Sequence, residues 1–198
     1  MNSVLVLGAS SGYGKAIAQD LMSDFEVFGL SRSMPQMLDI EHWLDCDLEE
    51  PQQVLLAMQQ LHAKEAKLSA AVSAVGGRAN VGWDQMTYYD LLYAGAKRVF
   101  SPLMLVKYLL DFGVLKWDGV VVFLDCRIGE GLTQAVGGTI MRPVVEEMSK
   151  HWPSSLRRAY VTPASRDKMG AEKDLNEQVR RILNEESTNE NMVSDGGE

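Results

Sequence analysis

The sequence predicts a single α/β domain in which a parallel β-sheet is covered by helices on both faces. Short apolar runs alternate with longer amphipathic runs along the chain, as expected for buried strands that are joined by helices. A glycine-rich segment follows the first apolar run directly and leads into the first amphipathic run. The chain has 198 residues, enough for one core. We therefore expect one domain at 1–183 and an acidic, mobile C-terminal tail at 184–198.

Six segments are predicted to be strands because they are short and rich in β-branched or large apolar side chains. In chain order these segments are 3–8, 25–30, 42–47, 68–75, 119–124 and 157–162. The clearest is 119–124, which reads GVVVFL. We expect the strand order 3-2-1-4-5-6, which is typical of a doubly wound sheet built from two βαβαβ halves.

Helices are predicted where apolar side chains recur at helical spacing and where residues that start or stop a helix flank them. The predicted helices are 13–22, 51–63, 89–112, 139–151 and 171–183. Pro51 lies in the first turn of its helix, where a missing N–H costs little, and Gly113 follows the third helix. The tail is rich in Asn, Glu and Ser, although MVSDGG at 192–197 also fits a short edge strand.

Composition and charge disfavour several partners and settings. The formal net charge is −8, which argues against nucleic acid and anionic membrane surfaces as partners. The apolar run from Leu103 is interrupted by Lys107 and Asp111, so no segment reaches the ~20 apolar residues needed to span a bilayer. Two cysteines, Cys46 and Cys126, do not suggest a disulfide framework, and no export signal is visible. We expect a cytoplasmic protein without a metal site.

The segment after the first strand reads GASSGYG, with glycines spaced as G-x-x-x-G-x-G. Between a strand and a helix, this pattern is typical of a loop that holds the pyrophosphate of a dinucleotide in a Rossmann-type domain. The first glycine allows a sharp turn, the second leaves room for a phosphate, and the third lets the helix pack closely. The predicted cofactor-binding residues are Gly8, Ser10, Ser11, Gly12, Tyr13 and Gly14. The alternative is a Gly-Ser turn without a ligand.

The end of the second strand indicates which nicotinamide cofactor is bound. NAD(H) sites usually have an Asp or Glu here that accepts a hydrogen bond from the ribose 2′-OH. This chain has Ser31, Arg32 and Ser33 instead. Arginine can hold the 2′-phosphate of NADP(H) by charge-assisted hydrogen bonds, and the second serine can add another. We therefore expect NADP(H), and the alternative is an arginine on a solvated loop.

With these features the chain resembles the short-chain dehydrogenase/reductase family. The resemblance rests on GASSGYGKAIA, on DCDLEEPQQV at the end of the third strand, on SAVGG at the end of the fourth and on VTPAS at the end of the sixth. It implies that Asp47 contacts the adenine and that a turn at Pro163 closes over the nicotinamide. The further cofactor-binding residues expected from it are Asp47, Leu48, Ala74, Val75, Gly76 and Pro163.

The catalytic half departs from the family pattern. The family uses a serine after the fifth strand and a Tyr-x-x-x-Lys motif in the following helix. Here the serine's place reads Asp125 and Cys126, the family spacing brings the tyrosine to residue 138 or 139, and no tyrosine lies between Tyr108 and Tyr160. The candidate catalytic residues are Asp125, Cys126, Arg142 and Tyr88. Each also has a structural interpretation, as a buried thiol, an ion pair or a packing residue.

We expect an atypical NADP(H)-dependent oxidoreductase that acts on a small-molecule substrate. A non-catalytic NADP(H)-binding protein, serving as a sensor, scaffold or partner subunit, is the main alternative, and a non-redox lyase or isomerase is the third. The resemblance implies a homodimer or homotetramer formed through the helices at 89–112 and 139–151.

Overall fold

The fold is built on a six-stranded parallel sheet with the order β3-β2-β1-β4-β5-β6. The structure is a computed structural model and describes residues 2–39, 41–75, 83–85, 87–124, 132–162 and 168–192. The strands are β1 (Ser3–Leu7), β2 (Glu26–Ser31), β3 (Trp43–Asp45), β4 (Leu68–Ser73), β5 (Leu115–Leu124) and β6 (Arg157–Val161). The predicted doubly wound α/β class and the predicted strand order are both confirmed.

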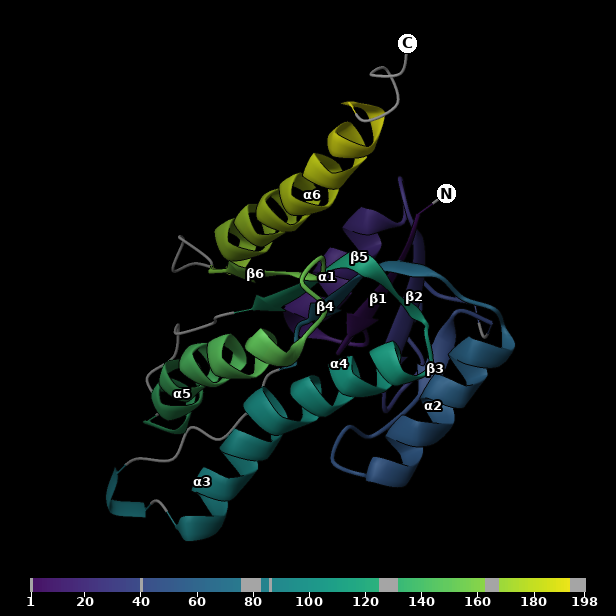
Figure 1. Cartoon of the computed structure of the whole chain (residues 1–198). Coiled ribbons are helices and arrows are strands. Elements are labelled where there is room, and N and C mark those ends of the chain that lie inside the picture. The colour runs from purple at the N-terminus through teal and green to yellow at the C-terminus, as the bar shows by residue number, and fades with distance from the viewer. Residues whose placement is uncertain are drawn as a thin grey trace.

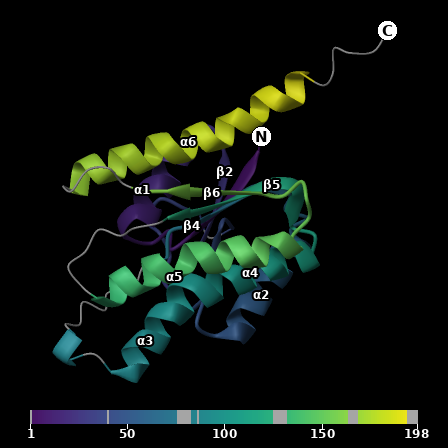
Figure 2. The ribbon, with the colours of Figure 1, turned by 60° about the vertical axis from the view of Figure 1, so that its left-hand side comes forward.

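Helices pack on both faces of this sheet, as Figure 1 and Figure 2 show. The helices α1 (Gly12–Leu21) and α6 (Lys168–Met192) cover one face. The helices α2 (Pro51–Ala63), α4 (Ser101–Asp111) and α5 (Leu132–Met148) cover the other. The helix α3 (Tyr88–Gly95) leads into α4, and 3-10 turns lie at Trp83–Gln85 and Ser149–His151.

The central strand β1 shows how the sheet serves two cores. All five of its residues are buried. Val4 and Val6 belong to the apolar cluster beneath α1 and α6, whereas Leu5 and Leu7 belong to the cluster on the opposite face. Successive side chains of a strand point to opposite faces, so a strand covered on both sides is almost entirely apolar. This is why the strands were visible as continuous apolar runs in the sequence.

The region predicted as one helix at 89–112 consists of three consecutive segments. After α3, the chain forms a π-helical turn at Ala96–Phe100 and then continues as α4. In this turn the N–H of Ser101 donates to the carbonyl of Ala96, and Pro102, which follows, has no N–H for the regular helical ladder. The apolar periodicity of the sequence did not show this break.

Three other boundaries also differ from prediction. The strand β5 begins before residue 119, and its first residues include the exposed Trp117 and Asp118, which the apolar pattern does not identify as strand. The helix α5 begins at Leu132, before the predicted start at 139.

The helix α6 continues past the predicted end at 183 to Met192, into the segment predicted as a mobile tail. No Pro or Gly interrupts 171–192, and polarity alone does not end a helix. The alternative of an edge strand at 192–197 lies outside the described residues, apart from Met192, which ends α6. Within the described ranges, no helix is long and apolar enough to cross a membrane.

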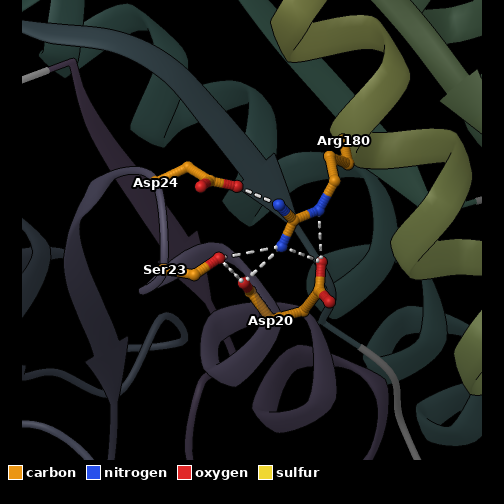
Figure 3. Close-up of polar contacts among 4 residues, drawn as sticks. All are labelled: Asp20, Ser23, Asp24 and Arg180. Atoms are coloured by element: carbon orange, nitrogen blue, oxygen red, sulfur yellow. Dashed lines mark hydrogen bonds and ion pairs between the residues drawn. The ribbon is translucent and has the colours of Figure 1, made fainter.

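Arg180, a partly buried residue of α6, joins α6 to α1 by hydrogen bonds and ion pairs (Figure 3). The guanidinium of Arg180 donates to the Asp20 carboxylate at 3.0 Å, to the Asp20 carbonyl at 2.6 Å and to the Ser23 hydroxyl at 3.2 Å, and it also pairs with Asp24. The Asp20 carbonyl belongs to the last turn of α1, where backbone acceptors lack helical partners and a positive charge is favoured. Arg180 therefore caps α1 while it holds α6 in place.

A close approach of two backbone segments joins α1 to the ends of β1 and β4. A Cβ atom added at Gly14 would lie 2.3 Å from the carbonyl oxygen of Gly8 and 3.2 Å from the Cβ of Ala74. Real Cβ atoms do not come this near to a backbone oxygen, so only glycine lets the first turn of α1 reach the sheet. The role that the sequence assigned to Gly14 matches this geometry.

We expect Gly14→Ala to lower the free energy of unfolding by about 2–3 kcal/mol, because two backbone segments must separate to admit the methyl group. Urea denaturation measures the change. The control is Gly95→Ala in α3, where the added Cβ would meet the Phe100 ring at 3.4 Å. That change should leave stability within about 1 kcal/mol of the wild type, since alanine is the better helix former. Equal losses in both variants would contradict the close-packing argument.

Candidate functional site

The N-terminus of α1 forms an open cradle above the end of β1. Gly8 and Gly12 have φ angles of +80° and +56°, in the left-handed region that glycine adopts without strain. A Cβ added at Gly12 would meet no atom within 4 Å, so the space in front of this residue is open. The N-cap residue Ser11 makes no side-chain hydrogen bond to the helix, and the first turn carries no acidic residue. The first-turn N–H groups have no acceptors within the helix, so the cradle suits an anion.

Backbone hydrogen bonds gather the ends of three strands around this cradle. The N–H of Gly8 donates to the Leu30 carbonyl at 2.8 Å, and the N–H of Ala74 donates to the Leu7 carbonyl at 3.1 Å. The C-terminal ends of β1, β2 and β4 therefore meet, as they must where parallel strands change direction of winding. Among the other predicted contacts of this region, Ser11 is exposed, Ser10 and Val75 are half-buried, and Tyr13 packs partly against the core beneath α1 and α6.

At the end of β2, hydrogen bonds shape the loop predicted to select the cofactor. The Ser31 hydroxyl donates to the Ser33 carbonyl at 2.8 Å, and the Ser31 carbonyl accepts from the indole N–H of Trp43 and the N–H of Cys46, each at 3.2 Å. These bonds hold the backbone on both sides of Arg32. Ser33 itself is exposed.

Arg32 and Asp47 form an ion pair across the ends of β2 and β3. The Nη1 of Arg32 lies 3.8 Å from the Oδ2 of Asp47. The other carboxylate oxygen of Asp47 accepts from the N–H of Glu49 at 3.1 Å, and the N–H of Asp47 donates to the Gln53 side chain at 2.8 Å. Sequence reading gave these two residues separate contacts, with the 2′-phosphate and the adenine, and did not pair them. The next predicted contact, Leu48, packs partly against the core beneath α2.

The thiol of Cys46, the residue before Asp47, is unreactive. Its side chain is buried, and burial raises its pKa to about 12, with the carboxylates of Asp47 and Asp45 adding to the rise. Since the thiolate is the reactive form of cysteine, Cys46 acts as a small apolar residue.

The candidate catalytic residues are only partly within the described structure. Asp125 and Cys126 lie outside the described residues, as do the predicted cofactor contacts Gly76 and Pro163. Tyr88 begins α3 and is 70% exposed, with its ring 6.2 Å from that of Tyr89. The helix start is formed by Thr87 and Asp90, which exchange side-chain and backbone hydrogen bonds as a capping box. The catalytic role suggested for Tyr88 stays a prediction.

Arg142 lies against a tyrosine that sequence reading did not single out. The guanidinium carbon of Arg142 is 4.6 Å from the ring centroid of Tyr160, and the Tyr160 hydroxyl donates to the Arg142 carbonyl at 3.5 Å. The Tyr160 ring also lies 6.0 Å from that of Phe123. Arg142 on α5 is therefore joined to β6, one residue before the end of that strand. The only sequence signal for Tyr160 was its place at the end of the tyrosine-free interval.

Burial raises the pKa of the Tyr160 phenol above its ordinary value, and the carboxylate of Glu146 adds to the rise, while Arg158 and Arg142 oppose it. The phenol thus keeps its proton at neutral pH. Among the described side chains, no group of three or more His, Cys, Asp or Glu residues is arranged to hold a metal ion.

Comparison with known proteins finds that the fold of this chain is similar to those of several solved structures. No family model matches the chain, and no curated protein matches it. It is similar to a short-chain dehydrogenase/reductase family oxidoreductase from Brucella ovis, solved with a partially ordered NAD, at 21% identity and a TM-score of 0.75 over 91% of this chain and 92% of that one. It is similar to aldohexose dehydrogenase of Thermoplasma acidophilum, in ligand-free form, at 19% identity and a TM-score of 0.71 over 87% and 76% of the two chains.

A short-chain dehydrogenase from Streptomyces avermitilis gives a TM-score of 0.71 at 18% identity, over 85% of this chain and 68% of that one. These likenesses confirm, at the level of the fold, the resemblance to the short-chain dehydrogenase/reductase family that the sequence motifs indicated.

The raised pKa of Tyr160 predicts a specific pH dependence of stability. Because the folded state holds this proton more tightly than the unfolded chain, the protonated phenol stabilises the fold. This stabilisation is complete below the ordinary tyrosine pKa of 10.0 and is lost as pH rises through the raised value. We therefore expect the free energy of unfolding to fall less steeply above pH 10 in Tyr160→Phe than in the wild type. Denaturant unfolding across this range measures the slopes, and parallel slopes would contradict the assignment.

Proposed function

We propose that the chain is an NADP(H)-dependent oxidoreductase of the short-chain dehydrogenase/reductase type that acts on a small molecule without the usual Ser-Tyr-Lys set. The observation that carries this proposal is the open glycine cradle at the N-terminus of α1, with a guanidinium at the end of the neighbouring strand β2. When bound, the nicotinamide cofactor would supply or accept a hydride.

The chain's own residues have distinct parts in this binding site. The first-turn N–H groups of α1 bind the pyrophosphate, and the positive end of the helix dipole favours its charge. Gly12 keeps space for that group because it has no side chain. Arg32 donates to a 2′-phosphate by charge-assisted hydrogen bonds. Asp47, Leu48, Ala74 and Val75 follow the ends of β3 and β4, along the same edge of the sheet.

The missing tyrosine limits the substrates that this chain can reduce. Reduction of a neutral ketone leaves negative charge on oxygen, and a positioned acid that supplies the proton contributes about 10²–10⁴-fold to the rate. An iminium group already carries positive charge, and a conjugated or quinone-like acceptor can take its proton from water. We therefore propose acceptors of these kinds. Among the candidate residues, Arg142 could stabilise negative charge, although its guanidinium packs against the Tyr160 ring.

The second candidate function is a non-catalytic NADP(H)-binding protein that serves as a sensor, scaffold or partner subunit. The observation that favours it is the absence of tyrosine between Tyr108 and Tyr160 together with Pro143 at one of the two positions expected for the lysine. This function would need the cradle and Arg32 but no proton donor.

We further propose that two copies associate through the exposed apolar face of α3 and α4. Tyr89 and Tyr93 lie one helical turn apart on α3, Phe100 and Met104 lie four residues apart where the π-helical turn leads into α4, and each of the four is 40% exposed or more. Ile140 is also exposed, and its helix α5 packs against α3 and against the π-helical turn that precedes α4. Large apolar side chains that are exposed on neighbouring helices are typical of a protein interface.

Dinucleotide binding is the first test of the proposed function. We expect calorimetry to detect NADPH binding in the wild type and none in Gly12→Val, because the side chain would fill the space meant for a phosphate. The matched control is Gly113→Val. Gly113 has a φ angle of +63° and likewise has no atom within 4 Å of an added Cβ, but it lies between α4 and β5. This control should lose stability yet keep affinity, and loss of binding in both variants would show a general folding effect.

Turnover of different acceptors is the second test. A missing general acid should raise the barrier for a neutral ketone by roughly 3–5 kcal/mol, so simple ketones and secondary alcohols should react slowly or not at all. The measurement follows the absorbance of reduced nicotinamide with carbonyl, imine and enone substrates. Fast ketone reduction would show that another residue donates the proton. Tight NADPH binding without any turnover would favour the non-catalytic function.

Association is tested by sedimentation. Phe100→Asp should shift a dimer or tetramer toward monomer, because a carboxylate would be buried in the interface without a partner. Leu56→Asp on α2 is the control, since Leu56 and Phe100 have the same exposed fraction of 56%. A wild type that sediments as a monomer, or equal dissociation in both variants, would contradict this interface.

A further inference from the structure

We propose that Asp47 determines cofactor selectivity. Its carboxylate competes with the 2′-phosphate of NADP(H) for Arg32 and accepts a hydrogen bond from the 2′-OH of NAD(H), so that the site accepts NAD(H) as well as NADP(H). The inference rests on the proposed function, in which the cradle binds a nicotinamide dinucleotide. It departs from the sequence prediction of NADP(H) alone, because the structure places an acid within 3.8 Å of the predicted phosphate ligand.

The two side chains meet because β2 and β3 are parallel and end together. Ser31 is paired with Asp45 in the sheet, so the chain leaves both strands at the same edge. The Ser31 hydroxyl bond to the Ser33 carbonyl shapes the loop around Arg32. On the other side, the N–H of Glu49 donates to one carboxylate oxygen of Asp47 and leaves the other turned toward Arg32. The strand pairing and the loop hydrogen bonds therefore bring the side chains of Arg32 and Asp47 together.

Because the ion pair of Arg32 and Asp47 is exposed to solvent, Arg32 can leave Asp47 and bind another anion. The side chain of Arg32 is 69% exposed and that of Asp47 is 29% exposed. An exposed ion pair at this separation is weak. A 2′-phosphate, with more negative charge and several acceptor oxygens, can therefore draw the guanidinium away. Asp47 stays close by, held by Glu49 and Gln53, and its negative charge opposes the incoming phosphate.

The same carboxylate is suited to the cofactor that lacks this phosphate. In NAD(H) sites an acidic side chain accepts a hydrogen bond from the ribose 2′-OH. That acid is missing at the end of β2 in this chain, but the Asp47 carboxylate, which follows β3, lies 3.8 Å from the guanidinium of Arg32 at the end of β2. With NAD(H), the 2′-OH donates to Asp47 while Arg32 remains paired with it. With NADP(H), Arg32 turns to the phosphate, and Asp47 lowers the resulting preference.

The experiment compares the wild type with Asp47→Asn, Arg32→Gln and Asp45→Asn, using NADPH and NADH as ligands. Adenosine 2′,5′-bisphosphate and adenosine 5′-monophosphate serve as a second pair that differs only in the 2′-phosphate. Asparagine keeps the oxygen that accepts from Glu49, so the loop is preserved in Asp47→Asn. Asp45→Asn is the matched control, because it removes the same charge from an exposed residue of β3 two positions away. Circular dichroism confirms that each variant is folded.

We expect wild type to bind both dinucleotides. Asp47→Asn should raise the ratio of NADPH to NADH affinity about threefold to tenfold, by freeing Arg32 and weakening the contact with the 2′-OH. Arg32→Gln should lower the ratio, and Asp45→Asn should change it less than about twofold, since salt screens an exposed charge that forms no ion pair with any residue the structure describes. In the Arg32→Gln background, Asp47→Asn should have a smaller effect than in the wild type, because the two residues act together.

An unchanged ratio in Asp47→Asn, or an equal rise in Asp45→Asn, would overturn the proposal. An equal effect of Asp47→Asn with and without Arg32 would also overturn it, since the carboxylate would then act without the arginine. If the wild type binds neither dinucleotide, the proposed function itself fails, and that result is seen before any variant is compared.

Discussion

The contact between α1 and the backbone of Gly8 is the constraint on which the candidate site depends. A Cβ at Gly14 would lie 2.3 Å from the Gly8 carbonyl oxygen, so the helix can start directly above the sheet only with glycine there. This contact fixes where the first-turn N–H groups lie relative to the ends of β1 and β4. The positive φ angles of Gly8 and Gly12 turn the chain sharply enough to make that start possible. On the far end of α1, Arg180 caps the last turn and holds α6 against it.

Electrostatics at the neighbouring strand ends add a second level of control. The cradle offers a general anion site, which by itself does not distinguish one dinucleotide from another. In the proposed binding mode, discrimination depends on Arg32 and Asp47, which lie 3.8 Å apart and would respectively attract and repel a 2′-phosphate. Because both groups are exposed to solvent, salt and single substitutions can change the strength of their interaction with each other and with a 2′-phosphate. A buried pair would be far less adjustable.

The sheet edge near α5, where the family resemblance predicts the catalytic residues, is organised differently. On α5, Arg142 lies over the ring of Tyr160 and so links the helix to β6. Pro143 follows directly inside the helix, where it removes one backbone hydrogen bond. These residues occupy the region where the family resemblance expects the proton-donating set, and they contribute packing there. The proposed substrate range and the non-catalytic alternative both start from this contrast between a well-formed glycine cradle and a region that lacks the family's Tyr-x-x-x-Lys motif.

The sequence by itself determined the class of the fold, its strand order and the glycine cradle. These features follow from local rules: fully apolar runs specify strands covered on both faces, and a glycine spacing specifies a turn and a close approach. Only the tertiary structure decided the π-helical turn at Ala96–Phe100, the extension of α6 to Met192, the contact of Arg142 with Tyr160 and the pairing of Arg32 with Asp47. The last two join residues from different elements, and their meeting depends on strand register and helix packing. No local pattern encodes such distances, because each side chain is compatible with several neighbours until the whole sheet is assembled.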